Sequence, residues 1–160
     1  MSGSTPEALA DLEQELVRLA AAARALPDPD VTAIGDWTAR MVLAHVVFWH
    51  ESFARNVTDL AAGRTPIPLR GTYAVLGERA RAALGHLDLD ALLERLDAAQ
   101  VSIRRDIDSP AVQNIPYRHG SRPYGPTEHL RVTAGHVAAH AADLERILAG
   151  RTRRRGSAGR

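Results

Sequence analysis

The stretch PTEHLRVTAGHVAAHAADLERILAG, residues 126–150, decides the fold of this 160-residue chain. Its apolar side chains recur at alternating steps of four and three residues, which places them in one stripe along a helix. Pro126 suits the first turn of such a helix, and Gly150 is typical of its end. The pattern therefore predicts an amphipathic helix that packs against other helices. Its stripe consists of Leu130, Ala134, Val137, Ala141, Leu144 and Leu148.

Two earlier segments show the same helical spacing. The first begins at Ser4 or Thr5, either of which can cap a helix, and Pro27 ends it. Its stripe consists of Leu9, Leu12, Leu16, Leu19, Ala23 and Leu26. The second begins at Thr38, and Gly63 stops it. Its inward stripe consists of Val42, Val46, Trp49, Phe53 and Leu60.

The remaining segments complete an all-α pattern. Residues 72–109 also have helical spacing, with a break expected near residues 85–87, and no segment shows the period of two that is typical of strands. We therefore predict an all-α four-helix bundle over residues 5–150. A long loop, residues 110–125, precedes the last helix, and its Tyr117 and Tyr124 favour an ordered conformation. Residues 151–160 are rich in Arg and predict a disordered, basic C-terminal tail.

Two residue types are absent from the chain, and their absence excludes several mechanisms. The chain has no Cys, which excludes disulfides, thiolate metal sites and a Cys nucleophile. Its 20 basic residues are all Arg, which excludes Schiff-base and P-loop chemistry that depends on Lys. Histidine and carboxylate side chains remain as the strong metal ligands.

The charge distribution narrows the choice of partners. The last ten residues carry five Arg and no acid, so the net charge of +1 leaves residues 1–150 at −4. An acidic body is poorly suited to phosphate backbones, so we expect no nucleic-acid partner. No apolar run reaches the length of a membrane span, and residues 1–10 do not have the layout of a signal peptide. We therefore expect a soluble, cytoplasmic protein without a membrane partner.

Three histidines could share a metal ion. His136 and His140 lie four residues apart, so both side chains leave one face of the last helix, and this face turns toward the bundle interior. His45 lies on the inward stripe of the helix that begins at Thr38. If these two helices are antiparallel, the three imidazoles lie at similar heights and leave a coordination position open for water or substrate. Spacing alone does not decide between this metal site and its alternative, in which the histidines lie in the core or at the surface and bind no metal.

Two other side chains are candidates to support this cluster. Asp143 follows His140 by about one turn and could orient its imidazole as a hydrogen-bond acceptor, with an exposed position as the alternative. Trp49 follows His45 by one turn on the inward stripe, and we expect it to line the pocket.

The other four histidines fit the cluster less well. His50 points off the inward stripe, and His129 lies about 10 Å along the last helix from His136. His86 and His119 fall in connecting segments. We expect surface or capping roles for all four, with His119 and His129 within reach of a bound substrate.

The segments WTARMVLAH (residues 37–45), EHL (128–130) and GHVAAHAADL (135–144) together resemble the DinB/YfiT-like superfamily. It includes bacillithiol and mycothiol S-transferases and the mycothiol-dependent maleylpyruvate isomerases. The resemblance covers about residues 5 to 150, and its specific part is the Trp before the second helix with the His and His-x3-His pattern. It implies an up-down-down-up bundle with antiparallel second and last helices. It also implies a divalent metal on His45, His136 and His140; we expect Zn²⁺, with Ni²⁺, Mn²⁺ or Fe²⁺ as alternatives.

The resemblance implies chemistry on small molecules, and three functions stay open. The first is a metal-dependent transferase that joins a low-molecular-weight thiol, of mycothiol or bacillithiol type, to an electrophilic small molecule. Arg118, Arg122, Tyr124 and Arg131 are candidates to hold anionic groups of that thiol, with solvated charges as the alternative. The second is a metal-dependent hydrolase or self-resistance protein that opens a reactive molecule with water. The third is a non-catalytic module that binds a small molecule.

The chain departs from the family pattern at two points. Met41 stands where an acidic residue is common, so the first turn of the second helix lacks a carboxylate. We also expect the protein to lack the additional C-terminal domain of the maleylpyruvate isomerases, which argues against that particular reaction. The Ala-rich residues 20–25 could pack closely in a homodimer or inside the bundle, so a homodimer is a further expectation.

Overall fold

The computed structural model describes the backbone of residues 3–157 and the side chains of residues 3–150. This part of the chain forms five helices and two short strands. The strands pair antiparallel in the connection between the first two helices. The elements are α1 (Thr5–Ala25), β1 (Thr32–Ile34), β2 (Trp37–Thr38), α2 (Ala39–Ala61), α3 (Tyr73–Leu84), α4 (Leu89–Asp106) and α5 (Pro126–Ser157).

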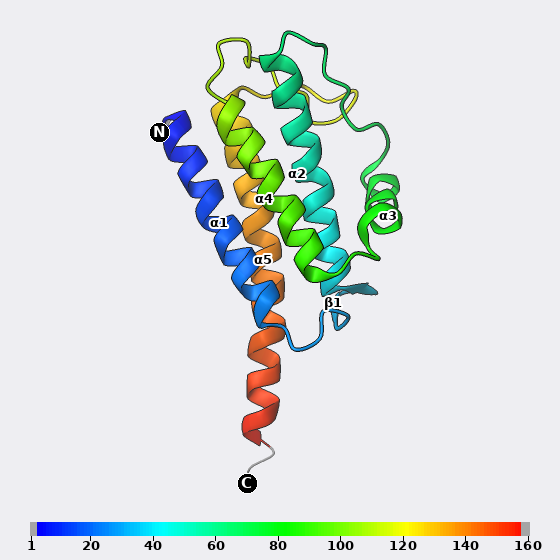
Figure 1. Cartoon of the computed structure of the whole chain (residues 1–160). Coiled ribbons are helices and arrows are strands. Elements are labelled where there is room, and N and C mark those ends of the chain that lie inside the picture. The colour runs from blue at the N-terminus through cyan, green and yellow to red at the C-terminus, as the bar shows by residue number, and fades with distance from the viewer. Residues whose placement is uncertain (1–2, 158–160) are drawn as a thin grey trace.

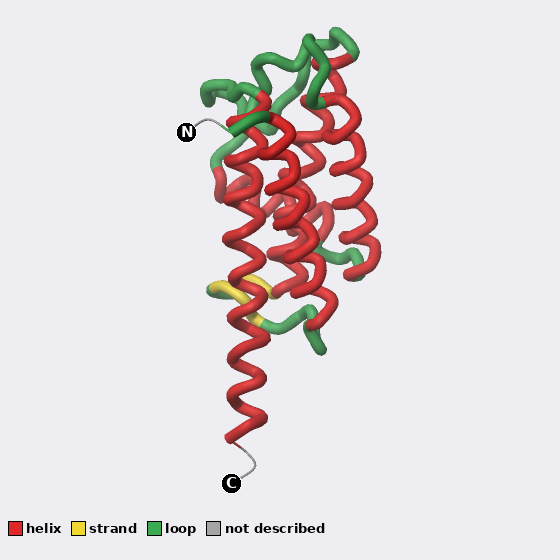
Figure 2. Tube along the Cα trace, turned by 90° about the vertical axis from the view of Figure 1, so that its left-hand side faces the viewer, coloured by secondary structure: helices red, strands yellow, loops and turns green. Residues whose placement is uncertain are grey.

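The four longer helices form a bundle, and α3 lies beside α2 on its outside (Figure 1). α1 packs mainly against α5, and α4 packs mainly against α2. α1 and α5 run in one direction, whereas α2 and α4 run in the opposite direction (Figure 1). This arrangement confirms the predicted up-down-down-up bundle, and it makes α2 and α5 antiparallel. The C-terminal part of α5 projects beyond the other helices (Figure 2).

Side-chain caps set the start of the first four helices. Ser4 caps α1 in a capping box: its hydroxyl accepts from the N–H of Glu7, and the Glu7 carboxylate accepts from the N–H of Ser4. Thr38 caps α2 with its hydroxyl, as its sequence position predicts. Thr72 and Asp88 cap α3 and α4 in the same way. The break expected near residues 85–87 is confirmed, because α3 ends at Leu84 and α4 starts at Leu89.

Two expectations about secondary structure were wrong. The helix predicted to stop at Gly150 continues to Ser157, since one Gly inside a helix costs only about 1 kcal/mol and does not force an end. The two strands were not expected, because segments of three and two residues are too short to show an alternating pattern. The domain boundary predicted at residue 150 stays a prediction. The disorder and the role of the basic tail also stay predictions, because its side chains lie outside the described residues.

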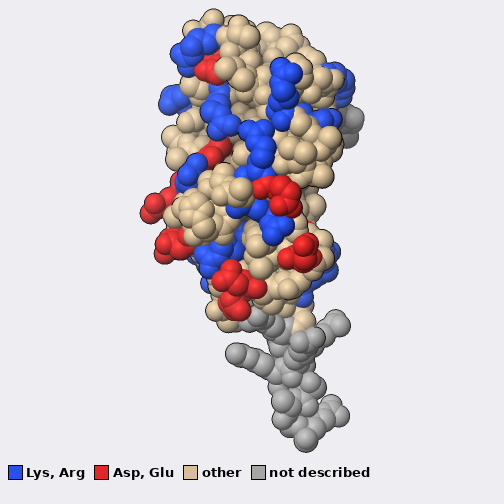
Figure 3. All heavy atoms as spheres, turned by 90° about the vertical axis from the view of Figure 1, so that its right-hand side faces the viewer, with Lys and Arg blue, Asp and Glu red and all other residues tan. Residues whose placement is uncertain are grey.

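The face of the molecule that carries α3 is rich in arginine. Figure 3 shows these basic side chains as a band along the middle of the face, with most acidic side chains nearer the end from which α5 projects. No helix in the described part of the chain is long and apolar enough to cross a membrane.

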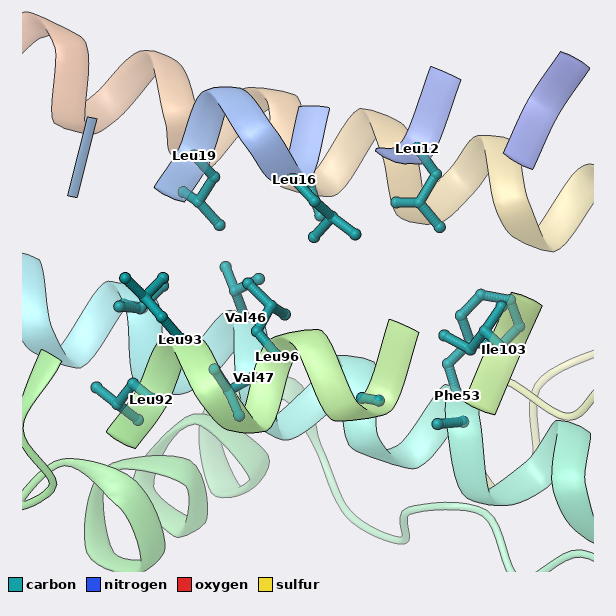
Figure 4. Packing of buried hydrophobic residues seen from close by; sticks show 14 of the residues in the cluster. Leu12, Leu16, Leu19, Val46, Val47, Phe53, Leu92, Leu93, Leu96 and Ile103 are labelled. Atoms are coloured by element: carbon teal, nitrogen blue, oxygen red, sulfur yellow. The ribbon is translucent and has the colours of Figure 1, made fainter. Parts of the chain in front are cut away.

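The core lies between the helix pairs and follows the predicted stripes. Leucines of α1 point across the interior toward leucines of α4 (Figure 4). On α5, Leu130, Val137, Ala141 and Leu144 are fully buried, whereas Ala134 and Leu148 are partly buried against the same cluster. The apolar stripe predicted for residues 126–150 is therefore the face that α5 turns toward the core.

Leu144→Ala is expected to lower the free energy of unfolding by about 2–5 kcal/mol. The change removes buried methyl groups from a fully buried side chain and leaves a cavity behind. The control is Val17→Ala on α1, where the side chain is 71% exposed and the expected change stays within about 0.5 kcal/mol. Urea unfolding of both variants measures the difference, and equal losses would contradict this assignment of the core.

Candidate metal centre

Three imidazoles meet between α2 and α5. His45 comes from α2, and His136 and His140 come from successive turns of α5. The Nε2 atom of His136 lies 3.0 Å from Nε2 of His45 and 3.1 Å from Nε2 of His140. One nitrogen from each ring lies within 4.8 Å of the other two. The antiparallel α2 and α5 thus bring the three predicted histidines together at one height.

Hydrogen bonding alone does not satisfy these nitrogens. Nδ1 of His140 lies 3.2 Å from a carboxylate oxygen of Asp143, so it carries the ring proton and leaves a lone pair on Nε2. His136 has a single Nε2 atom, which offers one hydrogen or one lone pair to two neighbouring imidazoles. A divalent ion satisfies all three, because histidine nitrogens bind such ions at about 2.0–2.1 Å from one centre. The donor set therefore fits a metal such as Zn²⁺, and Asp143 orients His140.

Burial keeps the three imidazoles in the form that binds metal. It lowers the pKa of His45 to about 4 and that of His136 to about 3, and the neighbouring imidazoles add to both effects. Burial also lowers the pKa of His140, although the Asp143 carboxylate opposes this change. At neutral pH the rings are therefore uncharged, so a metal ion does not have to displace protons from them.

Aromatic rings hold His45 on two sides. Trp37 and Trp49 contact it edge to face, with ring centroids 5.7 Å and 6.5 Å from the imidazole. Trp37 also packs against Gly77 of α3, where a Cβ atom would come within 3.3 Å of the indole. Trp49 stacks on Tyr117 at 5.1 Å. Through these contacts both α3 and the loop before α5 are placed relative to the metal centre.

The loop from residue 107 to residue 125 is held against the bundle. Ile115 and Tyr124 form a small antiparallel bridge, with N–H to carbonyl distances of 2.8 and 3.0 Å. Asn56 of α2 donates its side-chain N–H to the carbonyl oxygen of Pro116 at 3.1 Å. These bonds keep Tyr117 on the metal centre's side of the loop, in agreement with the predicted ordered loop.

Two histidines expected at the surface lie in the core instead. His50 is 1% exposed, and its Nε2 atom lies 2.8 Å from the side-chain oxygen of Gln100 on α4. His129 is 2% exposed and stacks on Phe53 at 4.0 Å. Burial lowers the pKa of both to about 4. The prediction failed because helical spacing treats histidine as polar and does not show a partner on another helix. The exposed positions of His86 and His119 are as predicted.

A small cavity lies beside His136. It measures about 20 Å³, and His50 and His129 contribute to its wall together with polar side chains that the sequence did not single out. This volume holds about one water molecule, so an organic substrate does not fit there in this conformation. The polar side chains are Ser52, Asn56 and Thr133.

The structure brings some of the other predicted pocket residues close to the site. Tyr124 lies near His129, with ring centroids 5.8 Å apart. The guanidinium of Arg118 lies over Tyr73, 4.6 Å from its ring centroid, and Tyr73 in turn contacts Trp49. Tyr73 was not singled out from the sequence, because it falls on the first turn of a helix outside the bundle.

Arg122 and Arg131 have other surroundings. Arg122 forms an ion pair with Glu128 and lies over Tyr124, so its charge is already balanced. Arg131 is exposed and lies next to Gly3 at the start of α1. Because two residues rotate a helix by about 200°, it points away from the side of α5 that carries His129. The structure does not bring Arg131 to the three histidines.

A family model described as the mycothiol maleylpyruvate isomerase N-terminal domain matches residues 12–145. The chain belongs to this family. The membership confirms the resemblance to the DinB/YfiT-like superfamily. The matched residues include α2 and the part of α5 that carries His136 and His140.

Two solved structures share the fold of this family member. The mycothiol-dependent maleylpyruvate isomerase matches with a TM-score of 0.72 at 17% identity, and a histidine-to-alanine mutant of such an isomerase matches with 0.70 at 16%. Each match covers 89% of this chain and 61% of the other, so this chain spans about three-fifths of their length. No curated protein matches the chain.

Metal binding should require His136 and depend on Asp143. We expect the untagged protein to bind about one divalent ion per chain and His136→Ala to bind none, because three nitrogens hold the ion. Asp143→Asn should weaken the affinity about 10–100-fold, since the His140 proton loses its carboxylate acceptor. His119→Ala, at an exposed loop position, serves as the control. Elemental analysis gives the number of ions per chain, and competition with a chelator gives the affinity. An unchanged affinity in His136→Ala would contradict the site.

Acid should destabilise the metal-free protein, with His50 as one source. Its pKa is about 4 in the folded chain and near the ordinary value of 6.5 when unfolded, so between these values the unfolded state binds more protons. Stability therefore falls as the pH drops from 6.5 to 4. In His50→Gln the slope should decrease by up to about 1.4 kcal/mol per pH unit. Unfolding at several pH values measures this slope, and an unchanged slope would contradict the lowered pKa.

Proposed function

We propose that this protein is a metal-dependent transferase that joins a low-molecular-weight thiol of mycothiol type to an electrophilic small molecule. The observation that carries the proposal is the convergence of three neutral imidazole nitrogens, from His45, His136 and His140, between α2 and α5. Membership of the mycothiol maleylpyruvate isomerase N-terminal domain family supports the choice of thiol.

The residues around the site would divide the work as follows. A divalent ion on the three imidazoles would supply a Lewis acid that lowers the pKa of a bound thiol, as such ions do for water. Asp143 keeps the proton of His140 on Nδ1, so that Nε2 stays available as a ligand. Trp37 and Trp49 flank the His45 ring with edge-to-face contacts. The attacking sulfur must come from a cosubstrate, because the chain has no Cys.

One observation favours a second function, a hydrolase that opens a reactive molecule with water. The cavity beside His136 has the volume of a single water molecule, and the polar side chains of Ser52, Asn56 and Thr133 form part of its wall. A water held there would lie next to the metal centre and could replace the thiol as nucleophile. Both functions use the same histidines, and only the dependence on added thiol separates them.

The metal-loaded protein should accelerate the reaction of mycothiol with a chloronitrobenzene. The sulfur forms a bond to the ring carbon, the carbon–chlorine bond breaks, chloride leaves, and the thiol proton passes to the buffer. In His136→Gln we expect the enzymatic rate to fall at least about 100-fold, because the variant loses the metal. His86→Gln, at an exposed position between α3 and α4, is the control and should keep it.

Mass spectrometry of the products separates the three functions. The thioether confirms the transferase. A hydroxylated product that forms equally fast without thiol would contradict the transferase and support the hydrolase. Metal-loaded protein that catalyses neither reaction on a panel of electrophiles would leave the binding module as the better account.

A further inference from the structure

Arg118 is unusual among the arginines of this structure. Four arginine side chains in the described part of the chain are half-buried: Arg18, Arg40, Arg81 and Arg118. The first three form ion pairs with acidic side chains. Arg118 has none among the described residues. Its side chain makes one hydrogen bond, from Nη1 to the carbonyl oxygen of Gly71 at 2.8 Å, and its Nε is buried without a partner.

A half-buried guanidinium without a counter-ion is unfavourable, because buried charges are normally paired. The position of Arg118 is nevertheless well defined. Its guanidinium lies on the ring of Tyr73, and its backbone is held by two hydrogen bonds with the Ser121 hydroxyl, at 3.2 and 2.8 Å. A fixed cation with free N–H groups is the arrangement that binds a carboxylate with little loss of side-chain freedom.

Aromatic rings connect Arg118 to the metal centre. Tyr73, which is 61% exposed, lies 6.1 Å from Trp49 between ring centroids, and Trp49 lies 6.5 Å from His45. Tyr117 stacks on Trp49 from the loop. A molecule held at Arg118 therefore meets the exposed ring of Tyr73, and the buried Trp49 connects this ring to His45. The basic band on this face would also attract an anion (Figure 3).

We propose that Arg118 binds a carboxylate on the electrophilic substrate, whose planar, apolar body lies against the exposed ring of Tyr73. That this ligand is the substrate rests on the proposed function. Its binding to Arg118 can be measured without thiol and without turnover. The two N–H groups of a guanidinium edge match the two oxygens of a carboxylate, and a neutral amide lacks this match.

Benzoate and its neutral analogue benzamide test this assignment on the full chain. We measure both affinities by ligand-observed NMR, with the metal present and after chelation. The wild-type protein should prefer benzoate over benzamide roughly tenfold, the effect of one charge-assisted hydrogen-bonded contact. Arg118→Gln should abolish this preference. Arg118→Lys keeps the positive charge but not the paired N–H groups of the guanidinium, so it should retain part of the preference.

Arg79→Gln is the matched control. Arg79 lies on α3, is exposed and has no acidic partner among the described residues, so its removal changes the charge of the face equally. The preference for benzoate should remain in this variant. An equal loss in Arg79→Gln would overturn the proposal by showing general attraction to a basic surface.

Four further results would overturn the proposal. In the first, Arg118→Gln still prefers benzoate over benzamide. In the second, the wild-type protein shows this preference only with the metal bound. In the last two, inorganic phosphate binds as tightly as benzoate, or the wild-type protein does not bind benzoate. Failure of the proposed function looks different. A protein that binds benzoate through Arg118 but forms no thioether would refute the transferase and leave the carboxylate site intact.

Discussion

The convergence of three uncharged imidazoles between α2 and α5 is the constraint on which the rest of the structure depends. The Nε2 atom of His136 lies 3.0 and 3.1 Å from those of His45 and His140, and its single proton or lone pair cannot serve both neighbours. The antiparallel direction of α2 and α5 brings His45 and the pair on α5 to one height (Figure 1). The up-down-down-up order provides that direction, with α3 in the connection that returns the chain from the end of α2 to the start of α4 (Figure 1).

Contacts between rings extend this site toward the surface. Trp49 lies between His45 and the rings of Tyr73 and Tyr117, which come from α3 and from the loop before α5. Two segments that are far apart in the sequence thus form one aromatic wall. Arg118 lies at the end of this wall and has no acidic partner in the part of the chain that the structure describes. If both proposals hold, a metal centre at one end and a guanidinium at the other would suit a small, flat, negatively charged molecule.

The sequence predicts those parts of the site that depend on helix geometry. His45, His136 and His140 follow from spacing on two amphipathic helices, and Asp143 follows from the next turn. The burial of His50 and His129 could not be predicted, since it depends on Gln100 and Phe53, which reach them from other elements or turns. Arg118 and Arg122 look alike in the sequence, and only the fold shows that Glu128 balances one of them.

The central claim is that His45, His136 and His140 bind one metal ion together. X-ray absorption spectroscopy of the zinc-loaded protein tests this claim most directly, because it reports the atoms bound to the ion. The account predicts three imidazole nitrogens at about 2.0–2.1 Å, with the remaining ligands from solvent. A shell made of oxygen atoms alone, or one with a single imidazole, would contradict it.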